Sequence, residues 1–201
     1  MPIVLILYPA LFASQSKFVR KVIGLTRNLS GFTLAYLDDP RGFVEQLQFP
    51  DGKLKELARL DSLEAGQITH AIVFDDGEEF VEERAWLADN GVTMRWVKTP
   101  LTRVVNIKRE PSYQQRRSDA GYEYIGRGSY WGNPHATFAE GESREEVIRK
   151  YAYDFTYNKF LNIEPGRVHE LAGKRLGCFC KPAPCHGDVL ADYLNGFDDG
   201  K

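Results

Sequence analysis

Residues 175–195 contain all three cysteines of the chain and one of its four histidines. In this segment Cys185 and His186 follow a proline-rich connector and precede apolar residues at helical spacing. A thiol at a helix N-terminus meets free backbone N–H groups and the positive end of the helix dipole, which lower its pKa. We therefore expect Cys185 to be a nucleophile or an anion anchor. His186 is then an acid or base, and Asp188 orients it.

The cysteines are open to two other interpretations. Cys178 and Cys180 lie on an expected strand, residues 175–180, and can fill a hydrophobic core. Four side chains can also ligate zinc: Cys178, Cys180, Cys185 and His186. They lie within nine residues, whereas a typical structural zinc site separates two close pairs by a long loop. The sequence establishes no cofactor, and zinc is the alternative that it offers.

A glycine-rich loop follows a second expected strand, residues 123–127. Glycines let the backbone approach a ligand, arginine and serine bind anions, tryptophan offers a flat face, and asparagine both donates and accepts. The same loop is equally compatible with a packing corner. The ligand-binding residues that we predict here are Arg127, Gly128, Ser129, Trp131, Gly132 and Asn133.

Basic and aromatic residues alternate along residues 103–127. This segment has six basic and three acidic side chains, with Tyr113, Tyr122 and Tyr124 between them. Arginines pair with phosphates and aromatic rings stack on bases, so the segment can bind nucleic acid. The alternative for residues 114–120 is a solvated loop.

The first hundred residues alternate between apolar runs and amphipathic segments, which predicts crossover units and a mainly parallel sheet. The fold class is therefore α/β, with a Rossmann-like domain at residues 1–100 and a second α/β domain at residues 103–196. No glycine-rich phosphate loop follows the first strand, so dinucleotide binding in the usual manner is not supported. The expected strands are residues 3–8, 32–37, 68–74 and 92–97, and the expected helices are residues 16–28, 54–63 and 78–90.

Composition indicates an ordinary globular protein. The net charge is −2, so overall electrostatics favour neither a nucleic acid nor a membrane as partner. Three clustered cysteines are typical of a reducing compartment, and we expect the cytoplasm. The apolar start reads as a first strand rather than a signal peptide, and no segment is long enough to span a bilayer.

The second half resembles a family of uncharacterised domains that is widespread in bacterial and phage genomes. The residues that carry the resemblance are Ile125-Gly126-Arg127, Trp131-Gly132-Asn133-Pro134 and the cysteine segment, in the order IGR…WGNP…CxCxPxPCHGD. The resemblance covers residues 103–196, and we recognise no family for the N-terminal half. Cys185-His186 is more distantly similar to another uncharacterised family that ends in a Cys-His-Arg turn. Glycine replaces that arginine here, so no anion-binding role carries over.

Neither family implies an activity, but occurrence in phages favours nucleotide metabolism or counter-defence. We expect a nucleotide-recognising enzyme, a transferase or hydrolase that acts on a nucleotide or on a base in nucleic acid. One alternative is a non-catalytic module that sequesters a nucleotide, with or without a stabilising zinc ion. A weaker alternative is an accessory protein that binds nucleic acid through residues 103–127.

Overall fold

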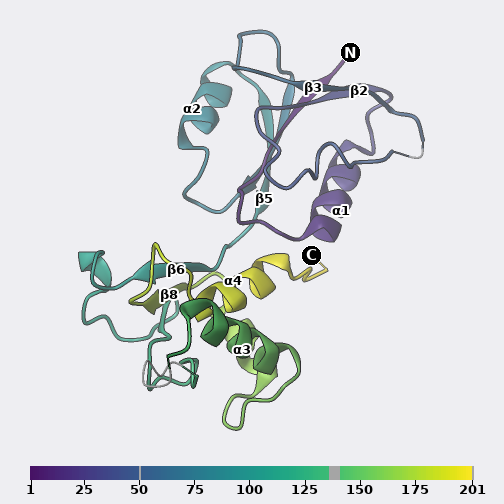
Figure 1. Ribbon diagram of the computed structural model, residues 1–201. Coiled ribbons are helices and arrows are strands. Elements are labelled where there is room, and N and C mark those ends of the chain that lie inside the picture. The colour runs from purple at the N-terminus through teal and green to yellow at the C-terminus, as the bar shows by residue number, and fades with distance from the viewer. Residues whose placement is uncertain (50, 136–140, 201) are drawn as a thin grey trace. The chain divides into compact units, whose positions relative to one another are not determined.

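The computed structural model describes residues 1–49, 51–135 and 141–200. The chain divides into two compact units (Figure 1). The first unit comprises Met1–Pro100 together with Gly196–Lys201, and the second comprises Leu101–Asn195. In the described part of the chain, no helix is both long and apolar enough to cross a membrane.

The first unit is built on a five-stranded sheet in which every pairing is parallel. Its strands stand in the order β3-β2-β1-β4-β5, so the direction of winding reverses between β1 and β4. This arrangement confirms the expected Rossmann-like α/β fold. The strands are β1 (Ile3–Leu7), β2 (Phe32–Tyr36), β3 (Leu54–Arg59), β4 (His70–Asp75) and β5 (Thr93–Lys98).

Two helices, α1 (Gln15–Thr26) and α2 (Val81–Asp89), cover opposite faces of this sheet (Figure 1). Phe74 of β4 stacks on Phe18 of α1, with ring centroids 5.1 Å apart. Val73, the preceding residue, packs in a cluster with Leu87 of α2. Neighbouring side chains of a strand point to opposite faces, so the two helices bury both sides. Burial on both sides explains why β1 and β4 read as continuous apolar runs.

One predicted element is wrong. Residues 54–63 were expected to form a helix, but Leu54–Arg59 is strand β3, which pairs in parallel with β2. The sequence LKELAR consists of strong helix formers, and its leucines fit a helical stripe as well as an edge strand. Pairing with the open side of β2 decides the conformation. Lys55 and Glu56 are exposed along this edge, where charged side chains oppose pairing with other chains.

The second unit contains a three-stranded parallel sheet in the order β6-β8-β7. Its strands are β6 (Arg103–Asn106), β7 (Tyr122–Tyr124) and β8 (Arg175–Cys178), and its helices are α3 (Arg144–Thr156) and α4 (His186–Gly196). Among its described residues are also two short 3₁₀ helices, η1 (Pro111–Tyr113) and η3 (Pro165–Leu171). The central strand β8 ends at Cys178, so Cys180 lies beyond the strand in which it was expected.

A buried cluster joins β8, α3 and α4 in this unit. Leu176, Tyr151 and Leu190 belong to it, and so do Cys178 and Cys185. The first turn of α4 packs closely because residue 187 has no side chain. A Cβ atom at Gly187 would lie 2.4 Å from Cδ1 of Ile125. A larger residue at the position of the glycine that replaces the arginine of the Cys-His-Arg family would therefore displace the side chain of Ile125.

Candidate functional site

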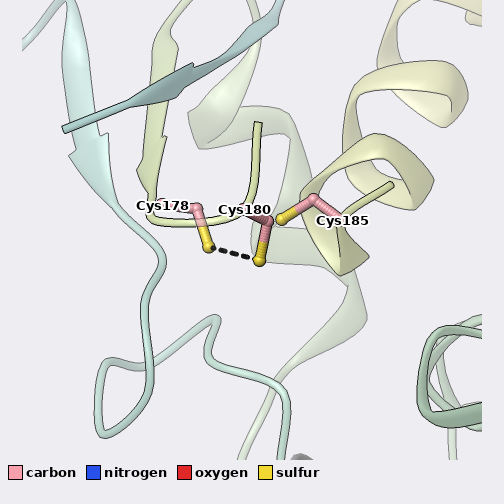
Figure 2. A group of neighbouring side chains, drawn as sticks. All are labelled: Cys178, Cys180 and Cys185. Carbon is pink, nitrogen blue, oxygen red and sulfur yellow. Dashed lines mark hydrogen bonds between the residues drawn. The ribbon is translucent and has the colours of Figure 1, made fainter. Parts of the chain in front are cut away.

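The three cysteines converge at the carboxyl end of β8 and the start of α4 (Figure 2). Their Sγ atoms all lie within 4.8 Å of one another, and those of Cys178 and Cys180 are 3.6 Å apart. We call Cys178, Cys180 and Cys185 the cysteine cluster. Cys178 is 4% exposed and Cys185 is 1% exposed, while Cys180 is partly exposed. Three thiols this close together can hold a metal ion.

A pocket of about 350 Å³ adjoins the cluster. All of its lining residues belong to the second unit. They bring together thiols, two arginines, one carboxylate and the start of helix α3. The lining residues that bear on chemistry are Cys178, Cys180, Cys185, His186, Arg127, Asn133, Glu142, Ser143 and Arg144.

The three thiols influence one another's pKa. The neighbouring Cys185 thiol lowers the pKa of Cys178, against the opposing effect of burial. The neighbouring Cys178 thiol and burial raise the pKa of Cys185. Burial and the charge of Cys178 raise the pKa of Cys180. Burial and the neighbouring Cys178 thiol thus oppose the lowering of the pKa of Cys185 that a helix N-terminus by itself favours.

His186 is buried and held by the backbone. Its Nε2 atom lies 2.9 Å from the carbonyl oxygen of Ile125, and its Nδ1 atom lies 3.7 Å from Sγ of Cys185. A carbonyl can only accept, so we place the imidazole proton on Nε2. Burial lowers the pKa of His186, which keeps the ring neutral near pH 7. Nδ1 is then an acceptor directed at the cysteine cluster.

Asp188 contacts the backbone and a lysine instead of orienting His186. Its Oδ2 atom accepts the N–H of Cys185 at 2.9 Å, and its Oδ1 atom lies 2.6 Å from Nζ of Lys181. The carboxylate therefore satisfies a free N–H at the start of α4. The carbonyl of Ile125 takes the orienting role that the sequence assigned to Asp188.

The glycine-rich loop divides into residues that reach the pocket and residues that pack. Arg127 is exposed and lines the pocket. Asn133 also lines it, but its Nδ2 atom donates to the carbonyl of Val147 at 3.0 Å. Its Oδ1 atom accepts the N–H of His135 at 2.9 Å. Asn133 therefore links the loop to α3. Both Nδ2 and Oδ1 already make hydrogen bonds, so a base edge recognised by Asn133 would have to replace these bonds.

The other loop residues predicted to bind ligand do not line the pocket. Trp131 is 3% exposed and belongs to the buried cluster, and its carbonyl accepts the hydroxyl of Tyr151. The hydroxyl of Ser129 donates to the carbonyl of Gly126 at 2.7 Å. Gly128 adopts a φ of +81°, and a Cβ at Gly132 would lie 2.7 Å from the carbonyl oxygen of Gly126. This part of the loop forms a packing corner.

Sequence reasoning missed the start of α3 as part of the site. Ser143 caps this helix, since its hydroxyl accepts the N–H of Glu146 at 3.1 Å, as the Ser-Arg-Glu-Glu sequence indicates. Arg144 follows, lines the pocket and donates to the carbonyl of Pro184 at 3.3 Å. A capping signal marks where a helix begins, but no local pattern places that helix beside a cysteine forty residues later.

In the basic segment, residues 103–127, part of the expected nucleic-acid surface is engaged internally. The guanidinium of Arg116 lies over the rings of Tyr113 and Tyr122, 5.6 and 5.4 Å from their centroids. It also pairs with Asp119 at 2.8 Å. The two tyrosine rings stack on each other at 5.5 Å. These groups stabilise the loop through contacts that a bound base would have to replace.

Models of two domain families match the two halves of the chain. The family model of the minimal SLOG domain matches residues 1–105, the half in which we recognised no family. The model of a domain of unknown function, DUF4326, matches residues 105–196. An uncharacterised 12.4 kDa protein from the nrdA-td intergenic region of Enterobacteria phage T4 is 42% identical over 72 residues. These matches support the resemblance to an uncharacterised phage and bacterial domain family.

The phage relative matches only part of the chain. The aligned region covers 35% of this chain and 65% of the length of the phage protein. No solved structure matches the chain.

Proposed function

Because the chain belongs to the minimal SLOG domain family through residues 1–105, whose Rossmann-like fold is associated with nucleotides, we propose that it is a nucleotide-recognising enzyme. The reaction is a transfer or hydrolysis on a nucleotide or a nucleobase. A relative encoded by a phage supports a role in phage nucleotide metabolism or counter-defence.

The SLOG match covers residues 1–105, whereas the observation that supports a reactive site lies in the second unit, where the pocket combines anion-binding groups with the cysteine cluster. Arg127 and Arg144 supply positive charge, and α3 begins at the pocket with its N-terminus. Arginine and a helix N-terminus both favour phosphate. A volume of about 350 Å³ lies within the range of small-molecule sites.

The cysteine cluster is the reacting group in this proposal. Cys178 is the thiol whose pKa is lowered, Cys185 lies beside it in the cluster, and neutral His186 can take or return a proton through Nδ1. Asp188 positions the first turn of α4. Arg127 binds the phosphate, while Gly128, Ser129, Trp131, Gly132 and Asn133 shape the loop that presents it.

Nucleotide binding is tested with the full chain and a panel of ribo- and deoxyribonucleotides, by equilibrium dialysis. Arg127→Ala and Arg144→Ala should each weaken binding at least about tenfold, since a lost charged hydrogen bond costs about 1.5–3 kcal/mol. Arg149→Ala is the matched control, because Arg149 is on α3 but pairs with Glu146 outside the pocket. Undiminished binding in the two pocket variants would refute this location of the nucleotide site.

A second candidate function is a non-catalytic module that sequesters a nucleotide and is stabilised by zinc. The metal-binding capacity of the cysteine cluster favours it. Mass spectrometry of the bound nucleotide over time separates the two functions. An enzyme converts the nucleotide, and Cys178→Ser stops conversion while leaving affinity in place. A sequestering module returns the nucleotide unchanged.

A further inference from the structure

We propose that the cysteine cluster binds a zinc ion through three thiolates, with the fourth coordination position open to the pocket. The spacing of the sulfur atoms supports this site. Four ligands placed tetrahedrally at a Zn–S distance of about 2.3 Å have their sulfur atoms about 3.8 Å apart. Sγ of Cys178 and Sγ of Cys180 are 3.6 Å apart, and no pair in the cluster exceeds 4.8 Å. Closing onto an ion requires shifts of about 1 Å or less.

The donor atoms select the class of ion. Thiolates favour soft or borderline ions such as zinc, whereas magnesium and calcium require oxygen ligands. Among the described residues, the cluster contains no carboxylate and no imidazole. The expected ion is therefore zinc or a thiophilic ion of similar size.

His186 was the fourth ligand in the zinc alternative drawn from the sequence, and the structure does not place it in the cluster. The cluster is defined by ligand atoms within 4.8 Å of one another, and it comprises the cysteines alone. Nε2 of His186 donates to the carbonyl of Ile125 at 2.9 Å, and its Nδ1, although 3.7 Å from Sγ of Cys185, is not among the clustered ligand atoms. Within the described residues three ligands face the pocket, which leaves one position for water or a bound molecule. An open position distinguishes catalytic zinc sites from closed structural ones.

Nearby groups offset the charge of this site. Three thiolates and one divalent ion leave a net charge of about −1. Arg127 and Arg144 line the same pocket, and the N–H of Gly187 donates to Sγ of Cys185 at 3.4 Å. Such outer contacts orient the ligands and adjust how strongly the metal polarises a bound molecule.

The open position indicates which reaction the pocket performs, a step that rests on the proposed function. Zinc lowers the pKa of water bound at its open position, which makes that water a better nucleophile near neutral pH. In hydrolysis the water oxygen bonds to the electrophilic atom of the nucleotide. The bond to the leaving group breaks, and the leaving group takes the proton. With zinc bound, all three thiols serve as ligands, so the water at the open position replaces the thiolate of Cys178 as the reacting group, and the reaction is hydrolysis rather than a thiol-dependent transfer.

The metal site is tested by titrating metal-free, full-length protein with Co²⁺, which absorbs where Zn²⁺ is silent. We expect one Co²⁺ per chain, a thiolate-to-cobalt charge-transfer band, and displacement by Zn²⁺. Cys178→Ser, Cys180→Ser and Cys185→Ser should each weaken Co²⁺ binding more than about tenfold. His186→Gln is the control, because its amide can still donate to the Ile125 carbonyl. Failure to bind Co²⁺, or equal loss in His186→Gln and Cys178→Ser, would overturn the three-cysteine site.

The open position is tested by adding azide to the Co²⁺-loaded protein. A shift of the visible cobalt bands indicates exchange at the fourth position, and unchanged bands contradict an open site. If the serine variants do not fold, alkylation of the natural chain replaces them: Zn²⁺ should protect all three thiols, and alkylation at the metal-free rate would refute binding. No nucleotide is present in these measurements, so the metal site and the proposed nucleotide recognition can fail separately.

Discussion

Both units are built on a parallel sheet, but different kinds of side chain pack against the two sheets. In the first unit, apolar side chains pack on both faces of the sheet. Phe18 and Phe74 lie on one face, and Leu87 and Val73 lie on the other. In the second unit, the central strand β8 ends in a thiol, and two cysteines belong to the buried cluster. Both sheets are parallel, so strand direction does not account for the difference.

This comparison shows how a core can provide either stability or chemistry. Apolar burial stabilises by about 25 cal/mol per Å², and the first unit uses its interior for that purpose. The second unit places thiols and an imidazole in its interior, where each polar atom needs a partner. His186 has the carbonyl of Ile125, and Cys185 has the N–H of Gly187. We therefore expect core substitutions to affect stability most in the first unit and function most in the second.

The largest expected effect on stability is that of Phe18→Ala in the first unit. Phe18 is 0% exposed, and its ring contacts Tyr8, Phe43 and Phe74 at centroid distances of 5.0 to 5.4 Å. Removing it should lower the free energy of unfolding by about 3–5 kcal/mol, measured by urea denaturation. Leu25→Ala on the same helix is 41% exposed and should cost about 0.5 kcal/mol or less. A variant of Phe18 that also loses Co²⁺ binding would contradict the division of roles.

A smaller effect on stability and a larger one on the site are expected for Gly187→Ala. The added methyl would meet Cδ1 of Ile125 at 2.4 Å and Cγ2 of Val104 at 3.0 Å. Overpacking should cost about 1–3 kcal/mol and displace the first turn of α4, which weakens Co²⁺ binding. Gly166→Ala is the matched control in the same unit, because no atom lies within 4 Å of its added methyl. Unchanged Co²⁺ affinity in Gly187→Ala would mean that the close packing does not position Cys185.

The smallest effect is expected for Ser143→Ala at the start of α3. The loss of the hydrogen bond from the N–H of Glu146 should cost about 1 kcal/mol of folding free energy. Ser143→Thr keeps an acceptor at this position and should retain most of the stability. Circular dichroism during thermal unfolding measures both variants. Equal destabilisation by threonine and alanine would show that space at the pocket, rather than capping, governs this position.

Some features could be predicted from sequence because they depend on neighbours along the chain. The apolar runs that became β1, β2 and β4 are long enough to identify strands buried on both faces. The cap at Ser143 follows from residues three positions apart. The strand β3 was misassigned because its residues favour a helix locally, and only pairing with β2 determines its conformation.

The sequence by itself determined that three cysteines and a histidine would lie near a helix start, since these four residues fall within nine consecutive positions. Only the tertiary structure decided that the three Sγ atoms lie within 4.8 Å of one another, and this proximity lowers the pKa of Cys178. It also decided that Arg144 joins the pocket. Closeness along the chain can be read from the sequence, whereas pKa values and ligand sites depend on the distances between side chains in the folded protein.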